Sequence, residues 1–228
     1  MKGLLQIAID GPVASGKSTV AKLLSERLRL LYVDTGAMYR ALALAAKNKR
    51  IDWGNQQEIV SLVSVVKIRL VKPQGERKDG RTVTVWLGNR DVSWEIRTQE
   101  IAEGASVVSQ YGRVREVLVK QQQAMAKRQG VVMEGRDIGT RVLVNAPLKI
   151  FMSASVEKRV KWKRAQMKAQ GQVLPMKSVR EALLKRDRRE MKRKVDPLRP
   201  AKGAWRLDTS ELSIEEVVER IVERVKKL

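Results

Sequence analysis

A glycine-rich segment between a strand-like run and a helix-like run constrains the fold of this chain most strongly. Residues 11–18 match the pattern Gly-x4-Gly-Lys-Ser/Thr, the apolar run 4–9 precedes them, and apolar residues at helical spacing follow. The glycines let the backbone curl so that its N–H groups point inward, and the helix N-terminus adds partial positive charge. The segment therefore predicts a strand, a loop and a helix that together hold a polyphosphate. The predicted loop residues are Gly11, Pro12, Val13, Ala14, Ser15, Gly16, Lys17, Ser18 and Thr19.

Two side chains at the end of this loop carry chemistry. Lys17 is placed to reach the β- and γ-phosphates of a bound nucleotide, and the Ser18 hydroxyl can ligate Mg²⁺. The flanking strand and helix favour nucleotide binding over a chance glycine-rich helix start.

The composition narrows the possible reactions. The chain contains no cysteine, which excludes disulfides and thiol catalysis and favours a reducing compartment, so we expect a cytoplasmic protein without a membrane segment. It contains no histidine either, so the commonest general base is missing. Phosphoryl transfer fits this composition, because it depends on positioning and charge neutralisation.

The net charge of +22 predicts anionic partners. Much of the excess lies in residues 157–194, which hold fifteen Lys or Arg and four acidic residues. Three interpretations stay open for this segment: a solvated helical face, an arginine-rich lid that closes over phosphates, or a nucleic-acid patch.

Strand-like and helix-like segments alternate along most of the chain. This order predicts an α/β fold with a mostly parallel sheet covered by helices. Apolar residues alternate with polar ones between positions 67 and 93, around several turn-forming residues, which predicts an inserted antiparallel hairpin. The expected core strands are 4–9, 30–33, 131–133, 148–152 and 205–207.

Local signals predict where several helices begin and end. Capping boxes are expected at Asn55 with Glu58, at Ser178 with Glu181 and at Ser213 with Glu216. The helical pattern of residues 98–128 should break near 111–112, and the first basic helix should end near Gly171.

Four further segments stand downstream of the loop in a characteristic order. They are residues 34–40 (Asp-Thr-Gly-Ala-Met-Tyr-Arg), 95–100 (Glu-Ile-Arg-Thr-Gln-Glu), 135–140 (Gly-Arg-Asp-Ile-Gly-Thr) and 186–193 (Arg-Asp-x-x-Glu-x-x-Arg). With the loop, they make the chain resemble the bacterial cytidylate kinases over essentially its whole length. The loop and the Gly-Arg-Asp segment are the most specific of these signals.

The resemblance implies a P-loop nucleoside-monophosphate kinase fold: a five-stranded parallel core, a small antiparallel insertion that binds the monophosphate, and a helical basic lid. It implies transfer of a phosphoryl group from ATP to CMP or dCMP with Mg²⁺, by a monomer. We expect the core to comprise residues 1–66, 94–155 and 203–228, the insertion residues 67–93, extended by flanking helices, and the lid residues 156–202.

The residues agree with such a reaction. A phosphate acceptor needs no base to remove a proton, and arginine binds phosphate oxygens bidentately. By resemblance, Arg40 and Arg136 hold the monophosphate, and Thr35 contributes to the same site. Asp137 either accepts from the cytosine amino group or orients metal-bound water. The alternatives are a solvated helix charge for Arg40 and a structural salt bridge for Arg136 with Asp137.

The resemblance implies that Ser106 and Arg115, together with Asp137, select the base. An unpaired buried polar group costs roughly 1–3 kcal/mol, which is enough to separate cytosine from uracil. Without the resemblance, Ser106 would be a helix serine of no special role.

In the lid, a helix over 186–193 would place Arg186, Glu190 and Arg193 near one face, so that two cations flank one carboxylate. The family places substrate-contacting groups at these positions, with aspartate where this chain has Glu190. The extra methylene moves the carboxylate outward and alters the expected ribose contact. A helix-surface ion pair of Arg186 with Glu190 is the alternative.

Two other functions remain as alternatives. One is a P-loop phosphotransferase for UMP or a small metabolite. The other is a nucleic-acid-binding ATPase, which the sequence disfavours because aromatic residues make up only 4% of the chain and Trp162 alone lies in the basic segment. We therefore expect small-molecule nucleotides as partners and no specific nucleic acid.

Overall fold

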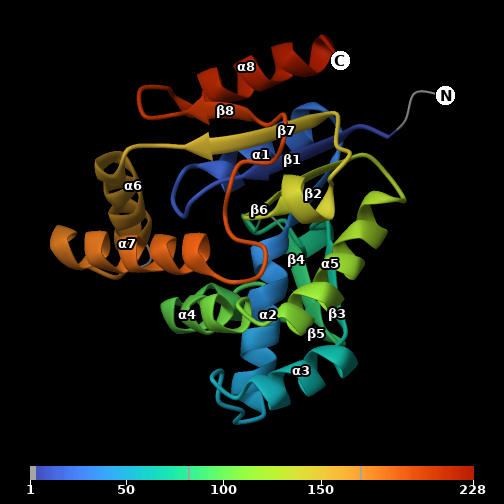
Figure 1. Cartoon of the computed structure of the whole chain (residues 1–228), viewed down its shortest axis with the longest axis vertical. Helices are drawn as coiled ribbons and strands as arrows, with labels where there is room; N and C mark the ends of the chain where they lie inside the picture. The colour runs from blue at the N-terminus through green and yellow to red at the C-terminus, as the bar shows by residue number, and fades with distance from the viewer. Residues whose placement is uncertain (1–3, 82, 170) are drawn as a thin grey trace.

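A five-stranded sheet organises the molecule (Figure 1). The computed structural model describes residues 4–81, 83–169 and 171–228, so residues 1–3 of the expected core, residue 82 of the expected insertion and residue 170 of the expected lid lie outside the description. Neighbouring strands are parallel throughout, in the order β2-β6-β1-β7-β8. The sheet strands are β1 Gln6–Asp10, β2 Leu31–Asp34, β6 Val131–Gly135, β7 Leu148–Ser153 and β8 Trp205–Asp208. The predicted α/β class and parallel core are confirmed.

Helices cover both faces of this sheet. Alternate residues of β1 and β7 pack with α1 and α8 in one apolar cluster, which includes Ile7, Ile150 and Val218. The intervening residue Ala8 belongs to a second cluster on the opposite face, with residues of α5 and of the π-helical segment η3. The helical elements around the sheet are α1 Lys17–Arg27, α2 Thr35–Asn48, α4 Gln99–Val108, α5 Gly112–Ala126, η3 Ile138–Val142 and α8 Ile214–Lys226.

The region between positions 67 and 93 forms the predicted antiparallel structure. Strands β3 Ile68–Val71, β4 Thr84–Leu87 and β5 Arg90–Asp91 pair in the order β3-β4-β5. Helix α3 Gln56–Val65 precedes this sheet, and the short helices η1 Gly75–Arg77 and η2 Glu95–Arg97 flank its later strands. Figure 1 shows α2 running from the main sheet alongside this second sheet, and α2 packs against β3 and β4.

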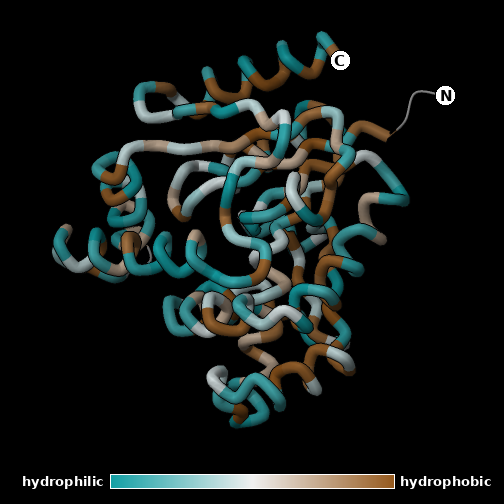
Figure 2. Tube along the Cα trace, in the orientation of Figure 1, coloured by the Kyte–Doolittle hydropathy of each residue, from teal (hydrophilic) through white to brown (hydrophobic). Residues whose placement is uncertain are grey.

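Two basic helices, α6 Val156–Ala169 and α7 Met176–Lys192, project from one side of the sheet (Figure 1). Their trace is mostly hydrophilic in Figure 2, with few apolar positions. Those few, including Val160 and Leu183, form a small cluster against which Val13 and Ala14 of the phosphate loop pack. The two basic helices, which the sequence predicts to form a lid, are therefore packed directly on the loop.

Most predicted helix boundaries are confirmed, and one is wrong. Asn55 caps α3, the reciprocal capping box of Ser213 with Glu216 starts α8, and a break separates α4 from α5 at residues 109–111. The expected start of α7 at Ser178 is wrong, because the helix begins at Met176 after Pro175. The N-cap is thus Pro175, three residues before the expected cap Ser178, and the φ of −58° that the proline ring fixes suits the start of a helix.

Candidate active site

The phosphate loop connects β1 to α1 in the geometry that its sequence predicts. Gly11 has φ 152°, and a Cβ there would lie 2.0 Å from the main-chain oxygen of Met152 in β7, so only glycine fits. Gly16, with φ 84°, precedes α1 directly. The loop is thus held against the centre of the sheet, with its backbone at the helix N-terminus where an anion is stabilised.

Lys17 is buried and folds back over the loop. Its Nζ donates to the main-chain oxygen of Pro12 at 2.7 Å and to Ser15 Oγ at 3.2 Å. Burial lowers the pKa of Lys17, the positive charge of Arg136 lowers it further, and Glu134 and Glu190 oppose this. Two cations from different parts of the chain therefore act on each other in a buried region.

Asp10, at the end of β1, is a site residue that the sequence reasoning missed. Its carboxylate accepts the main-chain N–H of Ile138 at 2.7 Å and of Gly139 at 2.8 Å, directly after Arg136 and Asp137. Burial raises the pKa of Asp10 to about 6, although the hydrogen bonds from the two main-chain N–H groups act to lower it. The available signal was an acidic residue at the buried end of a strand, immediately before the first loop glycine.

The start of α2 positions Arg40. Asp34 caps the helix by accepting from the N–H of Ala37 at 3.0 Å, and its second oxygen accepts from Arg40 Nη2 at 2.5 Å. Burial opposes ionisation of Asp34, but the charges of Arg40 and Arg97 and the N–H of Ala37 together outweigh it, and the pKa of Asp34 is lowered. Arg40 is thus fixed in a part-buried ion pair, unlike a solvated helix charge. Its Nε is buried without an acceptor among the described residues.

Thr35 and Glu134 join α2 to β6. Thr35 Oγ1 donates to the main-chain oxygen of Glu134 at 2.8 Å, and the Glu134 side chain accepts from the hydroxyl of Tyr32 at 2.9 Å. A Cβ on Gly135 would lie 2.6 Å from Thr35 Oγ1, so the first residue of the Gly-Arg-Asp segment must be small. Glu134 is a second residue that the sequence reasoning missed.

Glu190 lies between two arginines, but one of them differs from the prediction. Its Oε2 accepts from Arg136 Nε at 2.5 Å and its Oε1 from Arg186 Nε at 3.0 Å. Burial disfavours the charged form, yet the two arginines hold the pKa of Glu190 at about 2. The expectation that Arg193 flanks Glu190 on one helix face is wrong, because α7 ends at Lys192 and Arg193 is extended, with ψ 144°.

Arg193 turns instead toward Asp137. Its Nε donates to the main-chain oxygen of Asp196 at 2.5 Å, and its Nη2 lies 3.7 Å from Asp137 Oδ1, without a hydrogen-bond acceptor among the described residues. Asp137 also forms an ion pair with the buried Arg115, which binds Asp196 through its Nε at 3.0 Å. Arg136 and Asp137 therefore pair with other residues, and the salt bridge between them that was the alternative interpretation is not formed.

Ser106 is engaged by a lid residue. Its Oγ accepts from Arg189 Nη1 at 3.0 Å, which connects α4 to α7. Figure 1 shows these two helices next to each other on the lid side of the molecule. Arg189 lay in the predicted basic lid, but nothing in its spacing singled it out.

Two more lid residues reach the site without having been predicted. Arg159 donates to the main-chain oxygen of Val13 at 3.1 Å and to Asp187 at 2.7 Å, so it joins both lid helices to the phosphate loop. Burial lowers the pKa of Lys163, and the charges of Arg186 and Arg40 lower it further, which places Lys163 in the same positive field. The only sequence signal for Arg159 and Lys163 as site residues was that they lie in the basic segment 157–194.

The donor set suits a magnesium ion that is bound mainly by phosphate and water. Ser18 is exposed at the first turn of α1. No group of three or more His, Cys, Asp or Glu side chains in residues 4–81, 83–169 and 171–228 could form a metal cage. Mg²⁺ at nucleotide sites typically keeps several waters and few protein ligands, so a single hydroxyl fits this pattern.

None of the helices in the described part of the chain combines the length and the apolar character that a membrane span requires.

Comparisons with known proteins give consistent results. The family model described as "Cytidylate kinase" matches residues 7–227. A cytidylate kinase of Geobacillus sp. (strain WCH70) is 44% identical over 226 residues, covering 99% of this chain and 98% of the relative. One from Bacillus thuringiensis (strain Al Hakam) is 44% identical over 218 residues, covering 96% of this chain and 94% of the relative.

Among solved structures, an uncharacterized protein from Eubacterium ventriosum ATCC 27560 superimposes with a TM-score of 0.55 at 12% identity. The alignment covers 98% of this chain and 99% of the other. This likeness concerns the fold alone.

Proposed function

The chain belongs to the cytidylate kinase family, and we propose from this membership that it transfers the γ-phosphoryl group of ATP to CMP or dCMP, giving ADP and CDP or dCDP. The observation that carries the proposal is that two cations, the buried Lys17 and the part-buried Arg136, act on each other. Like charges in a buried region disfavour each other, as the lowered pKa of Lys17 reflects. Phosphate groups between them would neutralise both, and an ATP-to-monophosphate reaction brings such groups together.

The donor half of the site is the loop of residues 11–19. Main-chain N–H groups at the N-terminus of α1 would hold the ATP phosphates, and Lys17 would move from Pro12 to the β- and γ-oxygens. Ser18 would hold Mg²⁺, which supplies positive charge to the β- and γ-phosphates when it is bound. Bound phosphate would also raise the pKa of Lys17 and keep the ammonium charged.

The acceptor half would bind the monophosphate through Arg40 and Arg136, with Thr35 supporting the segment. The buried Nε of Arg40 and Nη2 of Arg193 lack acceptors among the described residues, so both donors can take phosphate oxygens without breaking a hydrogen bond. Arg186, whose pKa is lowered by burial and by the charges of Arg136 and Arg40, would bind the transferred group. No general base is required for this acceptor.

Cytosine selection would rest on Arg115, Asp137 and Ser106. The Arg115–Asp137 ion pair fixes the orientation of the carboxylate, and the extended Arg193 lies on its other side. Asp137 can then accept from the exocyclic amino group of cytosine, where uracil presents a carbonyl oxygen. Two acceptors facing each other are unfavourable, and this would disfavour UMP.

A panel of acceptors tests the function. With ATP and Mg²⁺, ADP release should be at least about a hundredfold more efficient with CMP or dCMP than with AMP, GMP or thymidylate, since a mismatched buried polar site is strongly selective. Equal turnover across the panel would contradict the proposal. Dominant turnover of UMP would assign the chain to the alternative uridylate activity. The absence of any turnover, with ATP bound, would point to a metabolite kinase.

We also propose that the protein acts as a monomer, because the proposed donor and acceptor groups all belong to one chain. Sedimentation equilibrium at catalytic concentrations checks this. A dimer whose dissociation abolishes activity would contradict it.

A further inference from the structure

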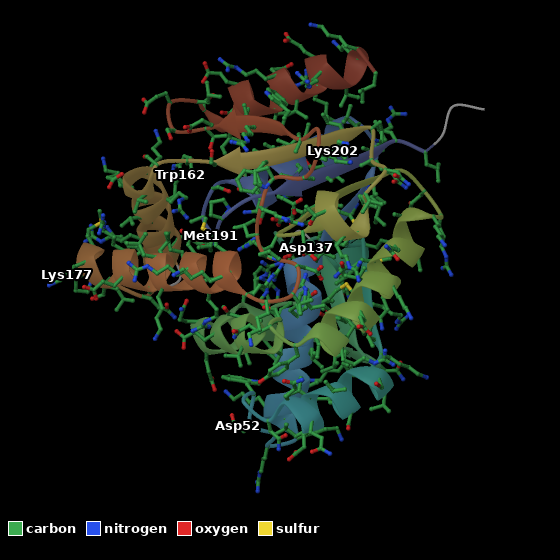
Figure 3. The ribbon with its side chains drawn as sticks, in the orientation of Figure 1. Asp52, Asp137, Trp162, Lys177, Met191 and Lys202 are labelled. Atoms are coloured by element: carbon green, nitrogen blue, oxygen red, sulfur yellow. The ribbon has the colours of Figure 1, made fainter. Side chains whose placement is uncertain are left out.

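A cavity of 760 Å³ lies outside the proposed nucleotide site and is lined by an unusual set of charges. Four of its lining residues are cations, and none is acidic. We call this cavity the cationic hollow and define it by those four residues: Lys149, Arg199, Lys202 and Arg206. None of the residues proposed above to bind ATP or CMP lines it. Figure 3 labels Lys202 near β7 and Asp137 near the centre of the molecule.

The sheet register explains why cations occupy this face. Lys149 in β7 pairs with Ala8 of β1, whose side chain faces the apolar cluster under η3. Arg206 in β8 pairs with Phe151, two residues after Lys149, so Lys149 and Arg206 share one face. The apolar residues of η3 cover this face of the sheet over β1, β2 and β6. The apolar cluster that they form includes no residue of β7 or β8.

The opposite face of the same two strands is fully used. Ile150 and Met152 of β7 and Leu207 of β8 are buried with the apolar residues of α8. The strands therefore alternate between an apolar side that packs on α8 and a side that carries cations. The segment 199–204, which leads from the lid into β8, completes the hollow with Arg199 and Lys202.

The four cations form no ion pair with any residue that the structure describes. Within residues 4–81, 83–169 and 171–228, no carboxylate lies within 4.0 Å of any of them, whereas the nearby Arg141 lies 3.5 Å from Asp196. The next acidic residue on β8, Asp208, accepts from Ser210 N at 2.9 Å and from Ser210 Oγ at 2.6 Å. Four unpaired positive charges around one concave surface create a positive potential that attracts anions.

We propose that the cationic hollow binds a chain of consecutive phosphates, a second anion site distinct from the nucleotide site. Arginine and lysine are the side chains that contact phosphate oxygens most readily, and several neighbouring cations match several neighbouring phosphates. The lining contains no aromatic side chain on which a base could stack, so recognition concerns the phosphates and carries no base preference. Two sources offer this chemistry: the backbone of single-stranded RNA, and a linear polyphosphate.

A salt-dependent binding measurement tests the proposal. A short fluorescein-labelled oligouridylate is titrated with the full-length protein by fluorescence anisotropy, at about 50 to 200 mM salt. Saturating ADP and CMP are present to occupy the nucleotide site. The test variant combines Arg199→Gln, Lys202→Gln and Arg206→Gln. The matched control combines Lys49→Gln, Lys127→Gln and Lys226→Gln, which removes the same charge from exposed residues outside the hollow.

Each phosphate contact on a single strand contributes about 0.7 to the slope of log K against log salt, so the test variant should reduce that slope by about 2. Its affinity at about 100 mM salt should fall at least about tenfold, and the control should change by much less. Competition by inorganic tripolyphosphate, with the slope change retained, identifies free polyphosphate as a ligand of the hollow. Failure of tripolyphosphate to compete identifies the RNA backbone.

Equal losses in the test and control variants, or no binding by the unaltered protein at about 50 mM salt, would overturn the proposal. Phosphoryl transfer by the test variant should keep its kcat and its KM for both nucleotides, which shows that the variant is folded. If the combined variant unfolds, the three single variants must each reduce the slope by about 0.7. This assay measures binding without turnover. Its result would therefore be the same if the kinase used an acceptor other than CMP or dCMP.

Discussion

Asp10 holds Gly139 by accepting its main-chain N–H at 2.8 Å, and the same carboxylate holds the preceding amide of Ile138 at 2.7 Å. Asp10 ends the strand that leads into the phosphate loop, and Gly139 follows the Arg136–Asp137 pair. The donor and acceptor halves of the proposed site are thus joined through one buried side chain, which we interpret as a positioning residue.

Asp10→Asn should impair acceptor binding. An asparagine side chain offers one oxygen and presents an NH2 group to the second amide, so one buried N–H loses its acceptor, at a cost of about 1–3 kcal/mol. We expect the KM for CMP to rise about tenfold while the KM for ATP stays within about twofold, since 1.4 kcal/mol corresponds to a factor of ten. Steady-state kinetics with each nucleotide varied in turn measure this.

The exposed Asp208→Asn is the control for that substitution, because its carboxylate contacts only Ser210 among the described residues. It should leave both KM values unchanged. An equal rise in both KM values for Asp10→Asn would show that Asp10 shapes the phosphate loop rather than the Arg136–Asp137 segment.

The stability of the nucleotide-free protein should depend on pH through the same residue. Burial raises the pKa of Asp10 from 3.8 to about 6, so the folded state holds this proton more tightly than the unfolded state. The resulting stabilisation is fully present below about pH 4 and is lost as the pH rises through about 6. About two pKa units correspond to about 3 kcal/mol.

Urea unfolding at several pH values measures this effect. Between about pH 4 and 6.5, the free energy of unfolding of the unaltered protein should fall relative to that of Asp10→Asn by about 2 kcal/mol. Parallel pH profiles for the two proteins would show that Asp10 has an ordinary pKa.

Glu190→Asp should shift the preference between CMP and dCMP. The shorter side chain cannot keep both the 2.5 Å contact with Arg136 and the 3.0 Å contact with Arg186, and it restores the aspartate expected at this position. We expect the ratio of kcat/KM for dCMP to that for CMP to rise by about fivefold, which corresponds to about 1 kcal/mol. Glu190→Gln, which removes the charge between two arginines, should instead lower both efficiencies. An unchanged ratio in the aspartate variant would show that Glu190 acts only on the arginines.

Lys17→Ala should remove phosphoryl transfer without unfolding the protein. Among the described residues, the lysine donates to Pro12 and Ser15 alone, both within its own loop, and the glycine backbone and the packing on β7 hold that loop in place. We expect kcat to fall at least about a hundredfold, as for other groups that stabilise transition-state charge. Far-ultraviolet circular dichroism and thermal unfolding should match those of the unaltered protein. A loss of helical signal would make Lys17 a structural residue.

Local patterns predicted the elements of this fold better than its contacts. The loop, the parallel strands and the box of Ser213 with Glu216 follow from short-range rules, and the structure confirms them. The pairing of Glu190 with Arg136 could not be predicted, because helix spacing describes neighbours three or four positions apart and these residues are 54 positions apart. Asp10 escaped notice for the same reason, since its partners are 128 and 129 positions away.

The error at Arg193 has a similar origin. Helical spacing was extended to residue 193, but the helix ends at Lys192 and the next side chain turns toward Asp137. The position of a helix end depends on tertiary contacts as well as on local sequence. One such contact is the hydrogen bond that the main-chain N–H of Leu198 donates to the main-chain oxygen of Glu190, at 3.0 Å.

Helix α2 links the ion pair at the main sheet to the antiparallel strands. The helix has 14 residues, so it spans about 21 Å at 1.5 Å per residue; it begins at the Asp34–Arg40 ion pair and packs against β3 and β4. If phosphate binding displaced Arg40, a tilt of the helix of about 10° about its first turn would move its far end by about 4 Å and carry the antiparallel strands with it.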